Sequence, residues 1–517
     1  MITGITADLV LYNARVITLD QRRPGAGVVA VKDGAILEVG ERDCLERFKG
    51  TKTRLIDCDG GTVVPGFNDA HCHPLSYAAT LLQADCSPSS AKNIAEIQAR
   101  VSREAEQVPE GRWVRAAQYN EVYLEENRHP NRWELDKAAP RHPVILLHCS
   151  GGMCVLNSLA LQLVGITRET PEPQGGRIGR DPETGEPDGL IVGRNKLVEN
   201  GLPPLNEEEL ARGARLAFRE YISHGITSIQ DTGWTNGLHH WRTLQRLKEQ
   251  GKLPVRFSMM LGSDAMAEFR DSGLFMGSGD SRLRVGGVKI ALDESTGCPH
   301  PPQEMLDDHA LRAHRAGFQL AFHVNDIYSL EAALASLELV LKQAPRSDHR
   351  HRLEHCAVCP SGLMRPLKET GAMVVTQPPF LYCFGDRFLS DVPSDRMSWI
   401  YPIRSLQKSG LKIAASSDSP VAPANPLLGM YAAVVRRTGT GQTISAWEGI
   451  APLEALKMYT HWAAYATFEE DVKGSISPGK LADLVVLSGD PLQVEREEIK
   501  EIKVMMTVID GKVVWER

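Results

Sequence analysis

The sequence contains no apolar run long enough to cross a membrane. A transmembrane helix requires about 18 or more consecutive apolar residues, and no stretch of the 517 residues approaches that length. The opening stretch, MITGITADLVLYNARVITLD, also lacks the basic start and the apolar core of a secretory signal peptide. These absences predict a cytoplasmic protein that has no membrane partner.

The chain also lacks a strong excess of either charge. Its formal net charge is −7, from 58 Lys and Arg against 65 Asp and Glu, and the two signs are interspersed. Without a basic face, nucleic acid is not an expected partner. The composition, 42% hydrophobic and 24% charged, is typical of a packed core, so small molecules are the expected partners.

Cysteine is sparse and follows no framework pattern. The ten cysteines are scattered along the chain, which is typical of free thiols in a reducing compartment. Cys356 and Cys359 form a C-x-x-C, but no second pair lies at zinc-ribbon spacing. We therefore expect these two cysteines to be packing residues. Internal repeats and low-complexity segments are absent from the sequence as well.

Both ends of the chain consist of short strand-like runs. ADLVLYNARVITL and VVAVKDGAILEVG lie near the start, and LADLVVLSGD and VMMTVIDGKVVWER lie near the end. Asp33-Gly34 and Asp510-Gly511 are two-residue hairpin signals within these runs. Because chain termini often lie close together, residues 1–62 and 474–517 predict one small β-sandwich, which the central segment interrupts.

The centre, residues 63–473, alternates strand-like and helix-like segments, the pattern of β/α units with a parallel sheet. Eight runs are predicted strands: 62–67, 226–231, 255–261, 285–292, 318–323, 350–355, 372–377 and 411–416. Eight such units predict a TIM (β/α)8 barrel, an α/β fold whose active site lies at the carboxyl ends of the strands. About 150 residues separate the first two strands, which predicts an insertion over about 76–205 that selects substrate.

The segment VVPGFNDAHCHP (63–74) places His71 and His73 one residue apart. Alternate residues of a strand point to the same side. Both imidazoles would therefore point to one spot, an arrangement that suits a metal ion. Taken alone, the pair is equally compatible with two hydrogen-bonded histidines at the entrance of a loop.

Polar residues recur at or near the carboxyl ends of four other predicted strands. They are Lys289, His323, His355 and Asp418. Each has a structural explanation when taken singly, since a histidine can be merely hydrogen-bonded and an aspartate before Ser-Pro can initiate a turn. Together with His71 and His73, however, they place six candidate ligands at one end of one barrel. The set predicts a metal centre.

Lys289 lies inside the apolar run VGGVKIAL (285–292), where an ammonium group should not be buried without a partner. A protonated amine cannot ligate a metal. Its carbamate, formed with carbon dioxide, has two oxygens that can bridge two cations. We favour the carbamate; a buried ion pair and an ammonium that binds a substrate carboxylate remain alternatives.

The order HxH, Lys, His, His, Asp on such a barrel, beside a sandwich, resembles the amidohydrolase superfamily, specifically the amidohydrolase family 3 group of YtcJ-like metal-dependent hydrolases. VVPGFNDAHCHP, VLNSLAL, GVKIALDES, RLEHC, SSDSP and GSISPGKLADLVVL match that group in order, over nearly the whole chain. The resemblance implies that one metal is held by His71, His73 and Asp418, and a second by His323 and His355, with carboxylated Lys289 as the bridge. Two zinc ions are expected, although manganese, cobalt or iron suit the same ligands, and a homodimer is expected.

Two positions depart from the pattern of that group. Gly152 stands in SGGMC where the group commonly has a histidine, and Glu294 stands in DES where it commonly has a glycine. We therefore expect substrate contacts that differ from the usual ones in the group, with the metal set intact.

The implied reaction is hydrolysis of a non-peptide C–N bond by a metal-bridged hydroxide, as in an N-substituted formamide, an N-acyl compound or a cyclic amide. Asp418 is the expected catalytic residue, which takes the proton of the hydroxide and passes it to the leaving nitrogen. Two alternatives remain. One is deamination of a heterocycle or hydrolysis of an ester on the same metal site, and the other is a barrel that binds metal or ligand without turnover.

Four further polar residues are candidates for substrate contact, and each also has a packing interpretation. They are Tyr119 and Asn120 in the insertion, His300 in the loop after the fourth barrel strand, and Gln377 at the end of the seventh. His224, directly before Gly225, is instead interpreted as a structural residue at a helix C-terminus.

Overall fold

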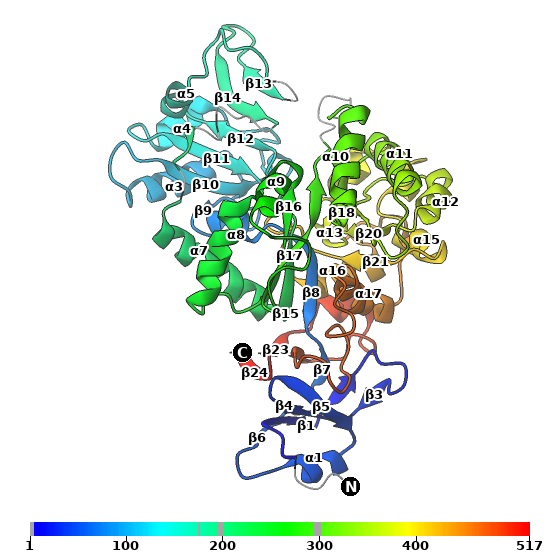
Figure 1. The fold of residues 1–517 in the computed structure, drawn as a ribbon. Helices are drawn as coiled ribbons and strands as arrows, with labels where there is room; N and C mark the ends of the chain where they lie inside the picture. The colour runs from blue at the N-terminus through cyan, green and yellow to red at the C-terminus, as the bar shows by residue number, and fades with distance from the viewer. Residues whose placement is uncertain (1–4, 174–175, 194–197, 199–200, 204, 293–300) are drawn as a thin grey trace. The chain divides into compact units, whose positions relative to one another are not determined.

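The computed structural model describes residues 5–173, 176–193, 198, 201–203, 205–292 and 301–517. The chain forms two compact units (Figure 1). One contains the described residues up to His73 together with 218–292 and 301–517, and the other contains 74–217. His300 and Glu294 lie outside the described residues. Within the described ranges, every helix is too short or too polar to span a bilayer.

A parallel eight-stranded sheet forms the centre of the first unit (Figure 1). Its order is β8 (Phe67–Cys72), β15 (Ile226–Asp231), β16 (Arg256–Gly262), β17 (Leu283–Ile290), β18 (Leu320–Val324), β19 (Arg352–His355), β20 (Met373–Thr376) and β21 (Ile413–Ala415). The backbone N–H of Asp418, just after β21, donates to the carbonyl oxygen of His71 at 2.8 Å. The first and last strands therefore meet, and the predicted (β/α)8 barrel is confirmed as a nearly closed one.

Helices follow the barrel strands along the chain. They are α8 (Leu238–Glu249), α9 (Met266–Asp271), α10 (Gln303–Arg315), α11 (Ile327–Gln343), α12 (Ser361–Glu369), α13 (Pro379–Cys383), α14 (Gly385–Asp391), α15 (Ile403–Lys408), α16 (Pro426–Val435), α17 (Pro452–Met458) and α18 (His461–Tyr465). Every residue of β8, β15, β16, β19, β20 and β21 is buried. Strands covered on both faces need continuous apolar runs, which explains why the sequence reveals them.

The first predicted barrel strand, 62–67, is wrong in its extent, because the run divides between two sheets. β7 (Thr62–Pro65) pairs with β2 (Arg15–Ile17) and β22 (Leu484–Leu487), and the barrel strand β8 begins only at Phe67. Gly66 lies between them, and a Cβ added there would meet the side chain of Thr227 at 2.2 Å. Since both strands are fully buried, one apolar run serves both, and its pattern does not mark the change of sheet.

The predicted β-sandwich is confirmed, and both chain ends build it. Its two sheets have the orders β5 (Ala35–Gly40), β4 (Val28–Lys32), β1 (Leu9–Tyr12), β6 (Arg54–Asp57), and β24 (Lys512–Glu516), β23 (Val504–Ile509), β22, β7, β2, β3 (Gly25–Ala26). α1 (Asp43–Phe48) follows β5. A common core contains Leu11, Val31, Val63, Leu484 and Val508, so residues from both ends pack together.

The second unit contains the predicted insertion and has its own mixed sheet. The strand order is β13 (Arg177–Arg180), β14 (Pro187–Val192), β12 (Met153–Leu156), β11 (Val144–His148), β10 (Val114–Tyr119), β9 (Ala84–Asp85). Its helices include α2 (Pro74–Thr80), α3 (Ile94–Ala105), α4 (Arg132–Ala138) and α5 (Ser158–Val164), and α7 (Glu207–Ser223) leads on to β15. Ile97, Val114, Leu135, Leu146 and Val155 share one core, so the insertion has a hydrophobic interior of its own.

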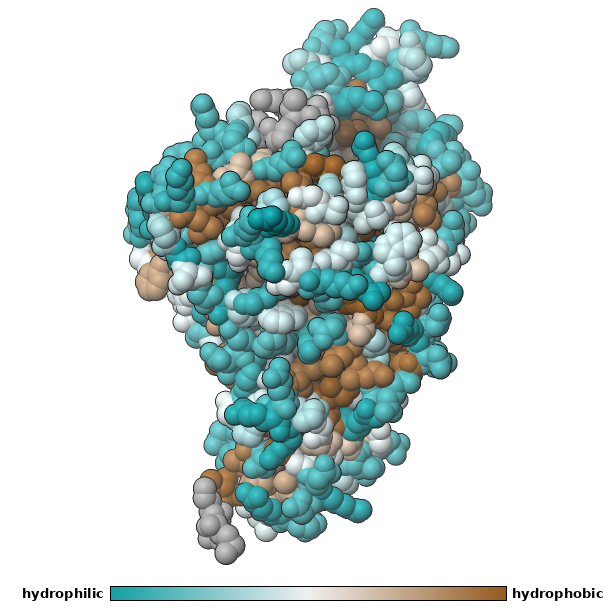
Figure 2. Space-filling model, turned by 90° about the vertical axis from the view of Figure 1, so that its right-hand side faces the viewer, coloured by the Kyte–Doolittle hydropathy of each residue, from teal (hydrophilic) through white to brown (hydrophobic). Residues whose placement is uncertain are grey.

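Hydrophilic residues predominate on one face of the molecule. On the face shown in Figure 2, teal hydrophilic residues extend over most of the surface, with smaller brown apolar areas between them. Large exposed apolar side chains include Phe275, Tyr328 and Trp447. Single exposed apolar side chains are common on protein surfaces.

A buried ion-pair network joins the barrel to the sandwich within the first unit. Arg256, at the start of β16, donates to both carboxylate oxygens of Asp483 at 2.6 and 2.9 Å and also to Asp510. Asp483 directly precedes β22, and Asp510 directly follows β23. Because a buried guanidinium must keep its carboxylate partner, this network fixes β16 against the two sandwich strands.

Replacing Asp483 by alanine leaves Arg256 with the partly exposed Asp510 as its carboxylate partner. Breaking a buried pair costs about 3–5 kcal/mol, and we expect the free energy of unfolding to fall by about 3 kcal/mol in urea denaturation at pH 7. The control is Asp391→Ala, whose exposed pair with Arg387 contributes about 0.5 kcal/mol or less. Equal losses in the two variants would contradict the role of the network.

Candidate metal centre

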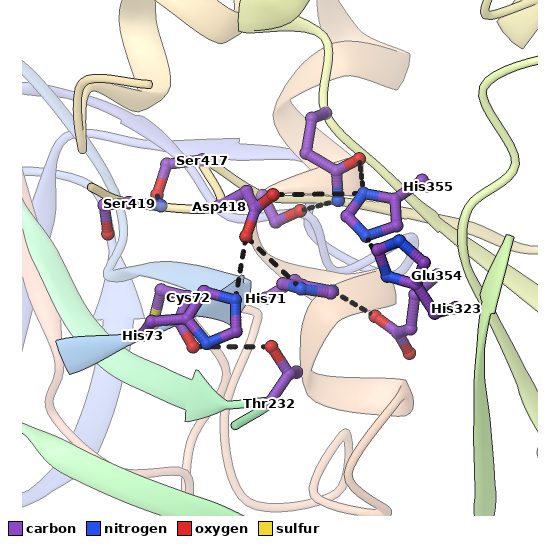
Figure 3. Close-up of polar contacts among 12 residues, drawn as sticks. His71, Cys72, His73, Thr232, His323, Glu354, His355, Ser417, Asp418 and Ser419 are labelled. Carbon is purple, nitrogen blue, oxygen red and sulfur yellow. Dashed lines mark hydrogen bonds and ion pairs between the residues drawn. The ribbon is translucent and has the colours of Figure 1, made fainter. Parts of the chain in front are cut away.

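Three of the predicted ligands meet at the carboxyl ends of barrel strands (Figure 3). His71 lies in β8, His355 ends β19, and Asp418 follows β21. One ligand atom from each lies within 4.8 Å of the others, and all three residues are buried. Among the described residues, this is the one cluster of three or more His, Cys, Asp or Glu with that spacing.

His73 follows β8 directly and joins this cluster. Its Nε2 lies 3.0 Å from Oδ1 of Asp418, and Nε2 of His71 lies 3.4 Å from the same oxygen. The two imidazoles of the HxH motif therefore converge on one carboxylate (Figure 3), although only His71 lies inside the strand.

His323 approaches His355 from the neighbouring strand, β18. Nδ1 of His323 lies 3.0 Å from Nε2 of His355, while its other ring nitrogen contacts Asn325 at 2.7 Å. Two imidazole nitrogens that face one small space are suited to a shared metal ion.

Lys289 lies in β17 and is buried, with 3% of its surface exposed. Burial is the main cause of the lowered pKa of both His71 and His355, and the positive charge of Lys289 lowers both further. The sixth predicted ligand is therefore a buried residue of β17 whose charge acts on both His71 and His355.

The protonation states of the cluster suit metal binding. Burial lowers the pKa of His71 and His355, which keeps their imidazoles neutral. Burial by itself raises the pKa of Asp418, but His71, His73 and His355 outweigh it and lower that pKa below its ordinary value. Neutral imidazole and ionised carboxylate are the forms that bind a divalent metal, so the residues present fit such an ion.

A side-chain hydrogen bond at Nδ1 orients each of two ligands, His71 and His355. Nδ1 of His71 donates to Oε2 of Glu354 at 2.5 Å, and Nδ1 of His355 donates to Oε1 of Gln377 at 2.7 Å. The bond of His71 leaves its Nε2 to face Asp418 at 3.4 Å. In His355, Nε2 faces His323, and Nδ1 also lies 4.0 Å from Oδ2 of Asp418. The sequence analysis missed Glu354. A glutamate inside the predicted strand RLEH should be paired when it is buried, and this could have indicated its role.

Asp69, which sequence reasoning also missed, links β8 to the loop that carries Asp418. Its carboxylate accepts from the backbone N–H of Ser417 at 3.0 Å and from the Ser417 hydroxyl at 2.5 Å. Burial raises the pKa of Asp69 to about 7.

Two of the predicted ligands have a strained backbone conformation, since Asp418 has φ 56° and His355 has φ 69°. Such residues gather where the surrounding structure fixes a functional side chain.

The candidates for substrate contact have mainly structural partners in the described residues. Gln377 is fully buried, and besides His355 it contacts the Ser416 hydroxyl at 3.0 Å, which makes it a positioning residue for His355. In the second unit, the Tyr119 hydroxyl contacts His129 at 3.0 Å, and Asn120 caps a short helix, η1 (Glu121–Tyr123). Contact of Gln377, Tyr119 or Asn120 with substrate stays a prediction.

A (β/α)8 barrel that gathers neutral imidazoles and a carboxylate at the carboxyl ends of its strands has the construction of a metal-dependent hydrolase. Comparison with known proteins gives the same class, since the model of the amidohydrolase family matches residues 54–515. The chain belongs to the amidohydrolase family. It is an enzyme that hydrolyses carbon–nitrogen bonds other than peptide bonds.

Relatives of similar length support this membership. An N-substituted formamide deformylase of Arthrobacter pascens is 31% identical, over 99% of this chain and 98% of the relative. A putative amidohydrolase, YtcJ of Bacillus subtilis, is 27% identical over 95% and 96%. The crystal structure of an uncharacterized metal-dependent hydrolase from Pyrococcus horikoshii has the same fold, with a TM-score of 0.74 and 22% identity over 94% of this chain and 99% of that one.

Replacing His71 by asparagine removes a nitrogen from the centre of the cluster. We expect the metal content per chain, measured by elemental mass spectrometry after purification without chelator, to fall by at least half, because a missing ligand weakens binding. The control is His314→Asn, a buried histidine of α10 that is hydrogen-bonded to His351 and to the Ala344 carbonyl. Full metal content in the His71 variant would show that the cluster is not the metal site.

Proposed function

We propose that this enzyme hydrolyses an N-substituted formamide to formate and a free amine at a centre of two metal ions. The observation that carries the metal centre is the convergence of His71, His355 and Asp418 within 4.8 Å. The substrate class is supported by the full-length similarity to a deformylase of that kind.

In this proposal the six predicted ligands divide between two ions. His71, His73 and Asp418 would hold one, His323 and His355 would hold the other, and a carbamate on Lys289 would be shared by both. The carbamate would form when the amine of Lys289, in its uncharged form, bonds to the carbon of carbon dioxide and loses a proton. Zinc suits this set of imidazole and carboxylate ligands, as do manganese, cobalt and iron.

A divalent metal at this centre lowers the pKa of a coordinated water to about 7, which supplies hydroxide at neutral pH. Asp418 performs the proton transfer. Its ionised carboxylate would accept the proton of the attacking hydroxide and deliver it to the amide nitrogen as the C–N bond breaks, so that the products are formate and an uncharged amine.

The bridging role of Lys289 is tested by Lys289→Ala. We expect about two metal ions per chain in the wild type, as the proposal requires, and one or fewer in the variant, measured by elemental mass spectrometry. One ion in both proteins would rule out the bridge and would leave Lys289 as an ion-pair partner or a contact for a substrate carboxylate.

The role of Asp418 is tested by Asp418→Asn, which keeps the size of the side chain and removes its basicity. Proton transfer by a positioned side chain contributes about 10²- to 10⁴-fold to a rate, so we expect kcat to fall within that range while most of the metal is retained. Near-normal turnover in a metal-loaded variant would exclude the role.

Product analysis separates this reaction from its alternatives on the same site. Equal amounts of formate and amine from an N-substituted formamide are the expected result. Ammonia released from a heterocycle would indicate a deaminase, and acid with alcohol would indicate an esterase. Absence of turnover of all three substrate classes by metal-loaded protein would favour a barrel that only binds.

A further inference from the structure

Glu354 is a buried carboxylate that the proposed reaction does not use. It and Arg352 have no exposed surface. Arg352 Nε donates to one carboxylate oxygen at 2.6 Å and Arg352 Nη2 donates to the other at 2.9 Å. The second of these oxygens also accepts the hydrogen bond of His71 Nδ1 at 2.5 Å (Figure 3).

Arg352 is itself fixed by two further strands of the barrel. Its Nη1 donates to Oε1 of Gln230 in β15 at 2.6 Å, and its Nη2 donates to the carbonyl of Ala70 in β8 at 2.7 Å. Nε2 of Gln230 donates in turn to the Ala463 carbonyl at 2.8 Å and contacts Oδ1 of Asn68 at 3.2 Å. Both partners of the pair are thereby held rigidly inside the barrel.

Stability alone does not explain such a pair. Desolvation of two buried charges costs as much as or more than their attraction returns, and well-packed apolar residues in their place are often neutral or stabilising. The hydrogen-bond acceptors behind the two oriented ligands also differ. His71 donates to the carboxylate of Glu354, whereas His355 donates to the neutral amide of Gln377. A carboxylate behind an imidazole raises the basicity of the nitrogen that faces the metal.

We propose that Glu354, fixed by Arg352, is a positioning residue that sets the metal affinity of the centre through His71. Its hydrogen bond holds His71 in the tautomer with Nε2 unprotonated, and its charge strengthens that nitrogen as a donor. This inference concerns only the ion that His71 would bind. It is valid whether the centre contains one metal ion or two. It rests on the proposed metal centre but not on the proposed substrate.

The test uses the full chain and changes both charges together, because either residue alone would leave its partner buried and unpaired. R352M/E354Q keeps an acceptor for His71 Nδ1 and removes the charge, and R352M/E354L removes both. Zinc affinity is measured by competition with a chromophoric chelator. We expect a loss of about 10-fold in the first variant and about 100-fold in the second, the range seen when such partners are removed.

The matched control is R256M/D483N, which removes another buried arginine–carboxylate pair, the one that joins the barrel to the sandwich and touches no predicted ligand. Urea denaturation of the metal-free proteins shows whether each variant folds. We expect the control to lose stability while its zinc affinity stays within twofold of the wild type. If R352M/E354L does not fold, R352M/E354Q decides the question.

A spectroscopic measurement separates positioning from general destabilisation. With cobalt in place of zinc, the visible absorption bands report the ligand field of the ion, and we expect them to shift in the Glu354 variants but not in the control. A folded Glu354 variant with wild-type zinc affinity and cobalt bands would overturn the inference. Failure of the two-metal proposal would appear separately, because the wild type would then bind one equivalent of zinc. The zinc affinities of the variants can still be compared with that of the wild type in this case.

Discussion

The junction between β8 and β21 is the contact on which the rest of the site depends. The backbone N–H of Asp418 donates to the His71 carbonyl at 2.8 Å, and Asp69 accepts two hydrogen bonds from Ser417. These bonds join the first and last strands of the barrel. They also bring the carboxylate of Asp418 to 3.4 Å from Nε2 of His71. The same hydrogen bonds therefore close the barrel and place Asp418 beside His71.

Two buried ion pairs of the barrel have different roles. At the start of β16, Arg256 pairs with Asp483 and thereby fixes the sandwich to the barrel. In β19, the pair of Arg352 and Glu354 leads instead to His71. This division agrees with the general construction of (β/α)8 enzymes, in which the carboxyl ends of the strands carry chemistry and the opposite end carries stability.

Most of the fold could be predicted because its strands are short, apolar and fully buried, and because a polar residue follows several of them directly. The exception is the run from Thr62 to Phe67, which supplies β7 of the sandwich and the start of β8 of the barrel. A buried strand has the same composition in either sheet, so hydrophobicity cannot tell which neighbour it will pair with.

By itself, the sequence determined the order of the barrel strands, the joining of both chain ends in one sandwich, and the six residues predicted to bind metal. Each of these has a local signal, an apolar run or a polar residue that ends it. Only the tertiary structure decided that Glu354 orients His71, that Gln377 orients His355 and that Asp69 secures the loop of Asp418. His71 and Glu354 are 283 positions apart, and a hydrogen bond over that separation depends on strand register and side-chain direction, which become defined only when the barrel closes.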